Sequence, residues 1–545
     1  MFSKLFFCRV QNSLSTLFTL YSHVSTCLIK TALVSLDERR LSSYNCTVRF
    51  SYEVFKVIQN TLLVRSVKAG RIHACAVAVA GAVLLGGCSM PSDYTMESVK
   101  SAEELGYTQT FKDIQAMNWP NDAWWARYQD AQLDLLIQEA LKDSPTLRIA
   151  ESRLKHAQGI AQQIGAIKKI QVGAEATASL TKVSYGYQAY HYPMYWNDFG
   201  TVTTNFSYEF DFWGKNKASV AAAASDYAAT EAEHASTRLM LSTSVANAYA
   251  ELARLYSNLD TVEAAVRVRQ KTVELLTKRF DNGLETKGAV SQAKAAAASV
   301  EAELLGIKES VELQKNALAA LMGKGPDRGR TISRPTVQLS DTFGLPEDLG
   351  VGLLGHRPDV TAARWRAEAA AQRIGVARGQ FYPNVSLSGF IGFQAFGIDN
   401  LTNDGNDAGS IGPAIYLPIF NGGRLEGQLT SAEADYETAV SSYNATLTNA
   451  LQEVADTMTS TKALDAQISK TRQAVDAAKE AHQIASNRYK GGLARYLDVL
   501  TAEDALLNSE RALVNLQSRS FSLDLSLIHA LGGGYESTPT QAQDK

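Results

Sequence analysis

Cysteine thiols and histidine imidazoles are the side chains that most often carry covalent or metal chemistry. In this chain their positions argue against both kinds of chemistry. All five cysteines lie within the first 88 residues, so the rest of the chain can form neither a disulfide nor a thiolate metal site. The later histidines are scattered, and none has a partner at metal-ligand spacing: His156, His191, His234, His356, His482 and His529. Neighbouring acids such as Glu503 and Asp504 fall in helical patterns, where a solvated helix face explains them. With no nucleophile motif either, we predict neither an enzyme nor a bound cofactor.

One cysteine stands in a context that predicts a different chemistry. Residues 64–87 begin with basic side chains and continue through an apolar run that ends at Leu85, Gly86, Gly87 and Cys88, an order typical of a bacterial export signal. The run is too short to span a bilayer as a helix. The four closing residues resemble the lipobox of bacterial lipoproteins, which implies cleavage before Cys88 and lipidation of that cysteine. The alternative is an ordinary cleaved signal with a cysteine there by chance.

Residues 1–63 lie upstream of a signal that should stand at the amino terminus. We interpret them as an over-extended start, with a true start near Val64 or Val67, and the alternative is a genuine N-terminal extension. Ser89 follows the lipobox in place of the aspartate of an inner-membrane retention signal. We therefore expect a lipid-anchored protein of the outer membrane of a Gram-negative bacterium.

The composition indicates a large folded protein. The chain has 545 residues, of which 45% are hydrophobic and 20% charged, enough for a sizeable core. Residues 1–88 hold ten Lys and Arg against three Asp and Glu, so their removal changes the formal charge from −3 to −10. This balance argues against a nucleic-acid partner, whose phosphates need a basic face.

The strongest internal pattern is a duplication. The stretch at 488–503 repeats the stretch at 279–294 with an offset of 209 residues. The offset pairs residues of the same kind: Arg279 with Arg488, Phe280 with Tyr489, Gly283 with Gly492, and Leu284 with Leu493. It also pairs Gly214 with Gly423. Because glycine tolerates the positive φ that ends many helices, we predict two copies of one long unit, each closed by a sharp turn.

Each copy predicts one very long helix. Residues 216–280 contain neither glycine nor proline, and their apolar side chains keep coiled-coil spacing, interrupted only by Arg269. A helix of this length extends about 97 Å at 1.5 Å per residue, which exceeds the diameter of a compact domain. Its counterpart is 424–488. Shorter helices should stack end to end in pairs beside the long ones, at 133–168, from the first turn to Leu321, at 360–378 and at 496–531.

Four segments alternate apolar and polar residues with period two, and we predict them to be strands: 171–183, 201–213, 384–396 and 410–420. Pro413 and Pro418 weigh against the last strand. The loop between the first two strands is crowded with aromatics, namely Tyr185, Tyr187, Tyr190, Tyr192, Tyr195 and Trp196. Such residues settle at a membrane interface, and packing beneath a soluble loop is the alternative.

Four membrane strands cannot close a barrel, because the smallest bacterial barrels have about eight strands and open edges are not tolerated in lipid. We therefore expect a homotrimer, which would close a twelve-stranded barrel and continue it as a tube of helices. Polar residues facing inward would line a wet lumen. This geometry predicts a passive conduit, and no nucleotide-binding loop is present to drive pumping.

Five stretches carry a resemblance to a known family: SYEFDFWGK at 207–215, HRPDV at 356–360, FYPNVSLSG at 381–389, LPIFNGGR at 417–424 and ALGGG at 530–534. They resemble motifs of the TolC-like outer-membrane efflux factors, and with the lipobox they resemble the lipoprotein branch that serves tripartite RND pumps. The resemblance runs from about Trp124 to Gly534. It implies a mainly α fold in which long helices form an α-barrel and the strands contribute a β-barrel.

Composition and periodicity indicate the organisation of the chain, and the resemblance implies the partners. We expect a lipidated tether at 88–120, a first repeat at 121–322, a connector at 323–349, a second repeat at 350–531 and a disordered tail at 532–545. The implied partners are a periplasmic adaptor protein, an inner-membrane RND pump and outer-membrane lipids, and the implied cargo is drugs, toxic compounds or metal ions. The alternatives are the outlet of a type I protein-secretion system and, in a different class, a structural coiled-coil lipoprotein.

Two candidate sites follow. The duplicated turns would form periplasmic tips that contact the adaptor through Arg279, Gly283, Leu284, Arg488, Gly492 and Leu493, unless the glycines merely cap helices. Just past the second turn, Leu497, Thr501 and Asp504 share one helix face, and a comparable face constricts the bore in the family. Thr501 stands where an aspartate is common in the family. The alternative for this gate is that Leu497 packs in the hairpin and the acids are solvated.

Overall fold

The computed structural model of the chain describes residues 96, 98–107, 109–111, 118–184, 193–337, 345–346 and 349–537. Contacts divide the chain into a unit of residues 1–88 and a unit of residues 89–545, and the described residues all belong to the second. The expected upstream extension, the signal, the lipobox and Cys88 therefore lie outside the described residues. The loop aromatics from Tyr185 to Tyr192 lie outside them as well.

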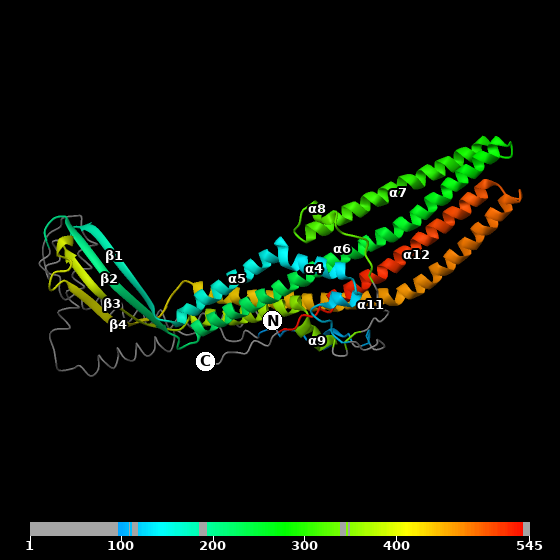
Figure 1. Cartoon of the computed structure of the whole chain (residues 1–545). Coiled ribbons are helices and arrows are strands. Elements are labelled where there is room, and N and C mark those ends of the chain that lie inside the picture. Colours follow the sequence, from blue (N-terminus) through cyan, green and yellow to red (C-terminus); the bar gives the residue numbers. More distant parts are fainter. Residues whose placement is uncertain are drawn as a thin grey trace, which may run out of the picture. The chain divides into compact units, whose positions relative to one another are not determined.

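Two pairs of long helices carry the fold (Figure 1). The first pair is α6 (Lys215–Asp281) and α7 (Lys287–Leu321), and the second is α11 (Arg424–Lys490) and α12 (Tyr496–Ala530). Every bound of the second pair lies 209 residues after the matching bound of the first. Glycines in the left-handed region precede both long helices, Gly214 with φ 74° and Gly423 with φ 87°. The duplication predicted from the sequence is confirmed, element for element.

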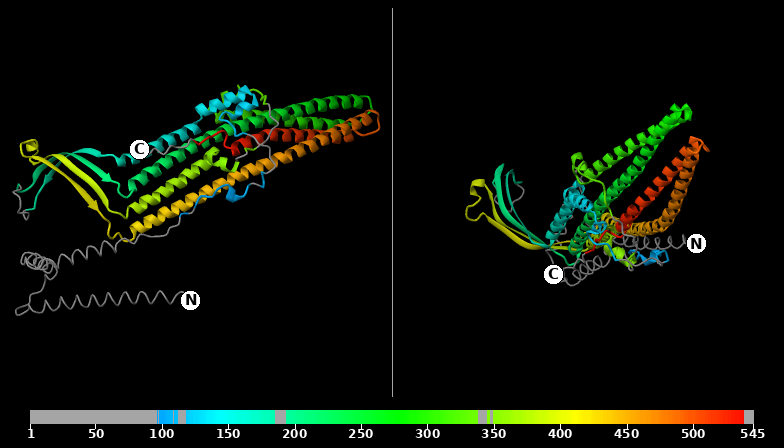
Figure 2. Two further views of the ribbon diagram at one scale, coloured as in Figure 1. Left: turned by 90° about the horizontal axis from the view of Figure 1, so that it is seen from below. Right: turned by 45° about the vertical axis from the view of Figure 1, so that its right-hand side comes forward.

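Shorter helices lie beside the long ones as a single curved layer (Figure 2). These are α4 (Ala131–Asp143), α5 (Pro145–Gly165) and α10 (Pro358–Gly379). Helix α6 packs against α5 and α7, and it also packs against α10 and α12, which in turn pack on α11. The predicted end-to-end stacking is confirmed in the first repeat, because Gly323, two residues after the end of α7, packs against Asp143 at the end of α4 and Pro145 at the start of α5. None of the described helices combines the length and apolar character needed to cross a bilayer.

Short helices connect these elements: η1 (Glu103–Leu105), η2 (Trp124–Tyr128), η3 (Ala166–Lys168), α8 (Pro326–Gly329), α9 (Leu349–His356) and η4 (Ile398–Asn400). The largest core cluster lies where η2 and α4 meet α6, the end of α7 and the end of α12. Its buried carboxylate, Asp130, caps α4 and accepts hydrogen bonds from Tyr249 (2.8 Å) and from the Thr336 backbone (2.8 Å). These bonds fasten the segment that follows α8 to the middle of α6.

The strands form one antiparallel sheet in the order β1 (Gln171–Thr181), β2 (Asn197–Phe210), β3 (Asn384–Phe396), β4 (Asp407–Tyr416). All four predicted strands exist, although β2 begins four residues earlier than expected and β4 ends before Pro418. Pro413 lies inside β4, opposite Leu387, and is tolerated because β4 is an edge strand. Within the described chain β1 and β4 each pair on one side only.

The predicted disordered tail is wrong for its first six residues. Gly532 to Gly534 all have positive φ and pack closely against other elements, with no room for a side chain. The Ser537 amide donates to the Gly355 carbonyl at 2.9 Å, and His356 Nδ1 lies 3.1 Å from the Tyr535 carbonyl. Residues 538–545 lie outside the described residues.

Candidate functional site

Each long helix ends in a turn closed by the same two backbone hydrogen bonds. After α6, the Gly283 amide donates to the Phe280 carbonyl and the Leu284 amide to the Arg279 carbonyl, both at 2.8 Å. The turn after α11 repeats the pattern, from Gly492 to Tyr489 at 3.0 Å and from Leu493 to Arg488 at 2.8 Å. This arrangement needs a left-handed residue after the helix, and Gly283 and Gly492 supply it with φ 68° and 78°. Backbone geometry therefore explains why the two copies share the same spacing from the arginine to the glycine and leucine.

The two turns of one chain are also joined to each other. The Arg279 guanidinium lies over the Tyr489 ring, 4.9 Å from its centre. The Tyr489 hydroxyl donates to Glu285 Oε2 at 2.6 Å. That hydrogen bond holds the pKa of Glu285 below its ordinary value, while burial raises the pKa of Tyr489. Sequence reasoning missed Glu285, because its partner lies 204 residues away in the chain.

The predicted tip residues consequently differ in accessibility. Leu284 and Leu493 are 67% and 74% exposed, unusually high values for leucine. Arg488 is exposed, whereas its counterpart Arg279 is half-buried over Tyr489. The structure therefore presents two leucines and one arginine to solvent, and it uses the other arginine to hold the tips together.

A buried ion cluster joins α6 to α12 above the tips. Arg269 is 1% exposed, its Nη2 donates to Asp504 Oδ1 at 2.6 Å, and its Nε lies 3.3 Å from Glu503 Oε1. Burial raises the pKa of Glu503, and the neighbouring Arg269 opposes that rise. The interpretation of Glu503 as a solvated acid is wrong. Arg269, the one interruption in the apolar spacing of α6, was the available signal.

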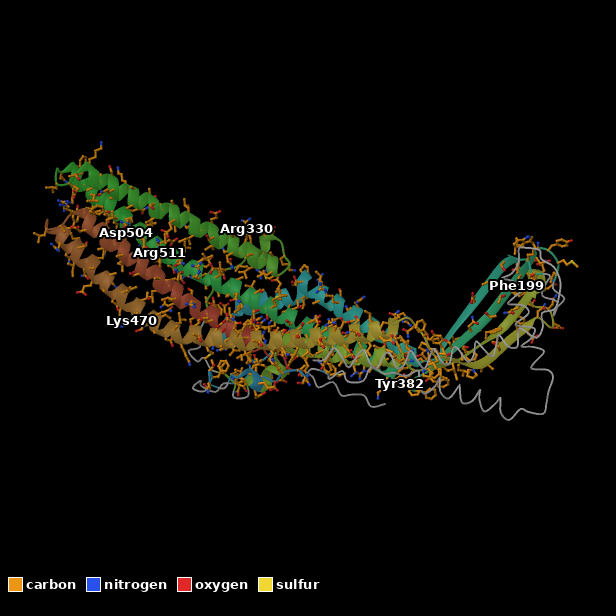
Figure 3. All side chains as sticks on the ribbon, turned by 180° about the vertical axis from the view of Figure 1, so that it is seen from behind. Phe199, Arg330, Tyr382, Lys470, Asp504 and Arg511 are labelled. Atoms are coloured by element: carbon orange, nitrogen blue, oxygen red, sulfur yellow. The ribbon has the colours of Figure 1, made fainter. Side chains whose placement is uncertain are left out.

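The candidate gate residues lie together on α12. Leu497 and Thr501 are both exposed, and the Thr501 hydroxyl donates to the Leu497 carbonyl at 2.9 Å. Asp504, labelled in Figure 3, keeps 56% of its side chain exposed although Arg269 holds one oxygen. The acid on this face is thus already paired with a cation of its own chain.

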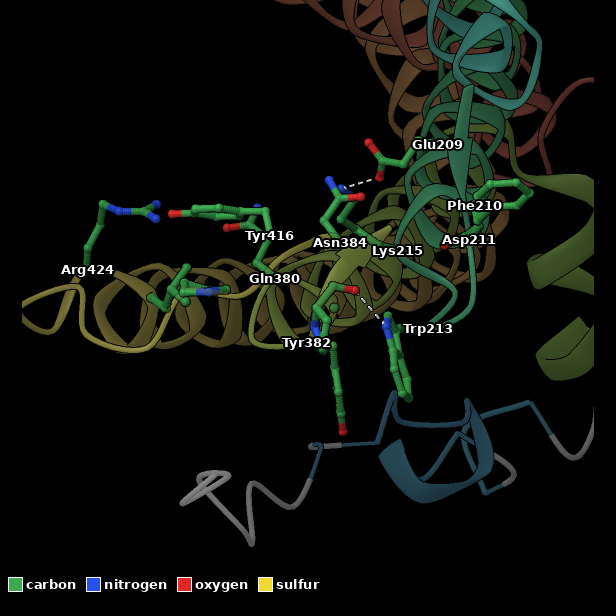
Figure 4. A pocket seen from close by; sticks show the side chains of 14 residues that line it. Glu209, Phe210, Asp211, Trp213, Lys215, Gln380, Tyr382, Asn384, Tyr416 and Arg424 are labelled. Carbon is green, nitrogen blue, oxygen red and sulfur yellow. Dashed lines mark hydrogen bonds and ion pairs between the residues drawn. The ribbon is translucent and has the colours of Figure 1, made fainter. Parts of the chain in front are cut away.

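A second site, which sequence reasoning did not identify, lies where the sheet meets the helices (Figure 4). Glu209, Lys215, Asn384, Tyr416 and Arg424 are among the residues that line a cavity of about 160 Å³. Lys215 Nζ lies 2.5 Å from Glu209 Oε1. In the lining of the same cavity, the Trp213 indole donates to the Pro383 carbonyl at 2.9 Å and stacks on the Tyr382 ring.

These contacts give a structural role to the five stretches that resemble motifs of the efflux factors. The stretches 207–215, 381–389 and 417–424 meet around this cavity. The stretches 356–360 and 530–534 meet at the far end of α12, where Gly532 packs against the His356 carbonyl. Both groups of stretches therefore form junctions between secondary-structure elements. Across the described ranges, no three histidine, cysteine or acidic side chains gather to hold a metal ion.

Comparison with known proteins agrees with this architecture. The sequence matches the model of a family described as "Outer membrane efflux protein" over residues 136–324 and 350–533. The fusaric acid resistance protein FusA of Burkholderia cepacia is 34% identical over 369 residues, which cover 65% of this chain and 68% of that protein. The multidrug resistance outer membrane protein MdtP of Shigella flexneri is 28% identical over 489 residues, covering 86% of this chain and 98% of that protein.

A solved structure extends the likeness to three dimensions. The outer membrane protein VceC of Vibrio cholerae superimposes with a TM-score of 0.73 at 65% sequence identity, covering 77% of this chain and all of that one. The matched family segments are the two halves of the duplication, each with one long and one shorter hairpin helix. The chain therefore belongs to the outer membrane efflux protein family.

Proposed function

We propose that three copies of the chain form the outer-membrane exit duct of a tripartite efflux system, which passively conducts drugs, toxic compounds or metal ions. The observation that carries this proposal is a four-stranded sheet, continuous with helices of 67 residues, whose edge strands β1 and β4 each pair on one side only within the described chain. Unpaired edges are not tolerated in a bilayer, and pairing β4 of one copy with β1 of the next removes them. The lumen would then be lined by the polar faces of the strands.

The exposed tips support a docking role toward a periplasmic adaptor protein, with an RND pump behind it. Helix ends are the only part of such a tube free to meet the end of another. Leu284→Asp combined with Leu493→Asp should abolish efflux, because two exposed apolar side chains are lost, while trimers persist on unheated gels. Leu135→Asp is the matched control, since Leu135 is 61% exposed but lies on α4. Unchanged drug resistance in the double variant would show that the tips do not dock.

The gate belongs to the same proposal. Leu497, Thr501 and Asp504 from three copies would narrow the tube near its periplasmic end. Because Arg269 holds one oxygen of each Asp504 and 56% of that side chain stays exposed, the three carboxylates would favour cations less strongly than unpaired acids. Leu497→Ala with Asp504→Ala should raise single-channel conductance in planar bilayers and weaken cation selectivity. If both quantities match the parent, the constriction lies elsewhere. Absence of any conductance in the parent would instead favour a structural coiled-coil lipoprotein.

Anchoring by lipid completes the proposal. Cys88 would become the first residue of the mature protein and carry acyl chains, several of which together hold a protein firmly at a membrane. Intact-mass measurement on membrane-extracted protein should show the added lipid. Cys88→Ala should impair sorting more than channel architecture, and an unmodified mass that begins before Cys88 would contradict the proposal.

A further inference from the structure

The two long helices begin at equivalent junctions with the sheet, and the first junction balances its charges. Lys215 opens α6, and its Nζ lies 2.5 Å from Glu209 Oε1. Asp211 accepts a hydrogen bond from the Asn216 amide at 3.0 Å and another from the Lys217 amide at 2.7 Å. Two carboxylates therefore satisfy the lysine and the amino end of α6.

The second junction has neither carboxylate. The offset of 209 residues places Arg424 at the position of Lys215, with Pro418 and Phe420 at the positions of the two acids. Arg424 is exposed, and its Nη1 donates to Gln428 Oε1 at 3.1 Å. Within the part of the chain that the structure describes, no carboxylate forms an ion pair with Arg424. Most of the five donors of this guanidinium are therefore open to a ligand.

The residues around Arg424 lie on the polar face of the sheet. Asn384 pairs with Tyr416 across β3 and β4, and directly opposite residues share a face. Tyr416 lies an even number of residues after Ser410 on β4, so alternation puts both on the face opposite to Ile411. The register between β2 and β3 puts Glu209 on the same face. In the duct proposed above, this face lines the lumen.

Tyr416 supplies an aromatic surface beside the cation. Its side chain is 68% exposed, and it lines the cavity of about 160 Å³ together with Arg424. Figure 4 shows the Tyr416 hydroxyl directed toward the Arg424 side chain, whereas Trp213 and Tyr382 point in a different direction. A guanidinium binds a carboxylate through two parallel hydrogen bonds, and an exposed ring can stack on another ring. This pair of side chains therefore suits an organic anion that carries an aromatic ring.

We propose that Arg424 and Tyr416 form a binding site for aromatic carboxylates at the neck of the duct, the level at which the sheet continues into the helices. This proposal rests on the trimeric duct proposed above, because that assembly places the polar face around a lumen. Three copies set three guanidinium groups around one axis, and their field attracts anions. The pair of Glu209 and Lys215 beside them adds no net charge.

Titration calorimetry of the detergent-purified full chain with benzene-1,3,5-tricarboxylate at low ionic strength tests the site. We expect the parent to bind the tricarboxylate but not the uncharged benzene-1,3,5-tricarboxamide. Arg424→Gln should raise the dissociation constant at least about tenfold, because charge-assisted hydrogen bonds are lost. Pro418→Glu should weaken binding in the same direction, because it restores an acid that the first junction has.

Lys217→Gln is the matched control, since it removes one cation from the first turn of α6 outside the cavity lining. Its dissociation constant should stay near that of the parent. Equal binding by the parent and by Arg424→Gln overturns the site, and so does a parent that binds neither compound.

Channel current separates this site from the duct on which it rests. In planar bilayers the tricarboxylate should reduce the current of the parent and leave that of Arg424→Gln nearly unchanged. Binding that does not reduce the current of the parent places Arg424 outside the lumen, which overturns the site while the duct stands. A parent without conductance, or monomeric particles in light scattering, overturns the duct itself and the site at its neck.

Discussion

A single residue out of pattern marks the contact that joins the two hairpins. Arg269 breaks the apolar spacing of α6, and the structure buries it against Glu503 and Asp504 of α12. The sequence shows the interruption but not the partners, which lie 234 and 235 residues further along the chain. A charged residue in a coiled-coil seam requires a partner in space, and only the tertiary packing of α12 supplies one. The solvated-face interpretation of Glu503 was wrong for the same reason.

Removing the Arg269 side chain should destabilise the fold. Breaking a buried ion pair from one side costs about 3–5 kcal/mol, because the remaining charge is left in a poorly solvated place. Since Asp504 still reaches solvent, we expect Arg269→Met to lower the free energy of unfolding by about 3 kcal/mol, measured by denaturant titration of helical circular dichroism in detergent.

Arg254→Met is the matched control for that measurement. Arg254 pairs with Glu251 on the same helix, and both side chains are about a third exposed (32% and 42%). A partly exposed pair of this kind contributes below about 1 kcal/mol. Equal losses in the two variants would mean that the burial of Arg269 carries no special weight.

At the scale of elements, the offset of 209 residues was a better guide than composition. It predicted the tip turns correctly, yet it also pairs Gly323 with Gly532, and that pair was overlooked. Both glycines have positive φ and follow a hairpin helix. Gly323 packs on the start of α5, and Gly532 packs on the residues before α10. The glycine-rich segment at 532–534 therefore has the composition of a disordered tail, but it packs at the junction between α12 and the residues before α10.

Strand ends were less predictable than helices. A helix bound in this chain is fixed by a glycine or a capping side chain, such as Thr286, which accepts from the Ala289 amide before α7. The bounds of β2 and β4 depend instead on how far the neighbouring strand continues. β2 pairs with β1, which precedes it, and with β3, which lies more than 170 residues later. Alternation reveals which residues share a face but not where pairing stops.

Three glycines of different surroundings give an element-scale prediction. At Gly283, φ is 68° with open space around an added side chain, so Gly283→Ala should cost about 1–2 kcal/mol from backbone strain alone. At Gly532, φ is 84° and an added carbon would sit 1.9 Å from the His356 carbonyl oxygen, so Gly532→Ala should cost clearly more. Gly306 lies inside α7 in open space, and Gly306→Ala should stabilise by about 0.5–1 kcal/mol.

Thermal unfolding of the three purified variants in the same detergent ranks their stabilities. The expected ranking of melting temperature is Gly306→Ala above the parent, then Gly283→Ala, then Gly532→Ala. If Gly532→Ala and Gly283→Ala have the same melting temperature, the close packing around residues 532–534 contributes nothing to stability.

For the whole molecule, the decisive feature is that the sheet has two chemically different faces. Val172, Ile391, Ile411 and Ile415 are all about 70% exposed within one chain. Register places Ile411 opposite Gly389 and its neighbour Ser410 opposite Phe390, so the two side chains leave opposite faces of β4. A water-soluble protein would bury one of these faces against its own helices, but the helices pack with each other beyond the end of the sheet. An assembly that places the apolar face in lipid and the polar face in a lumen satisfies both.

Ile411 and Ser410 are adjacent on β4, so a lysine at each position tests the two faces of the sheet at nearly the same depth in the membrane. Lysine on the lipid face of a membrane strand costs about 2–4 kcal/mol near the bilayer midplane, whereas lysine facing a water-filled lumen is solvated. Ile411→Lys should therefore reduce the amount of gel-stable trimer recovered from outer membranes, and Ser410→Lys should leave it near the parent level. The reverse result would put the apolar face inside the tube. Equal recovery of both variants would mean that β4 does not lie in the membrane, and the sheet would then need another partner to cover its apolar face.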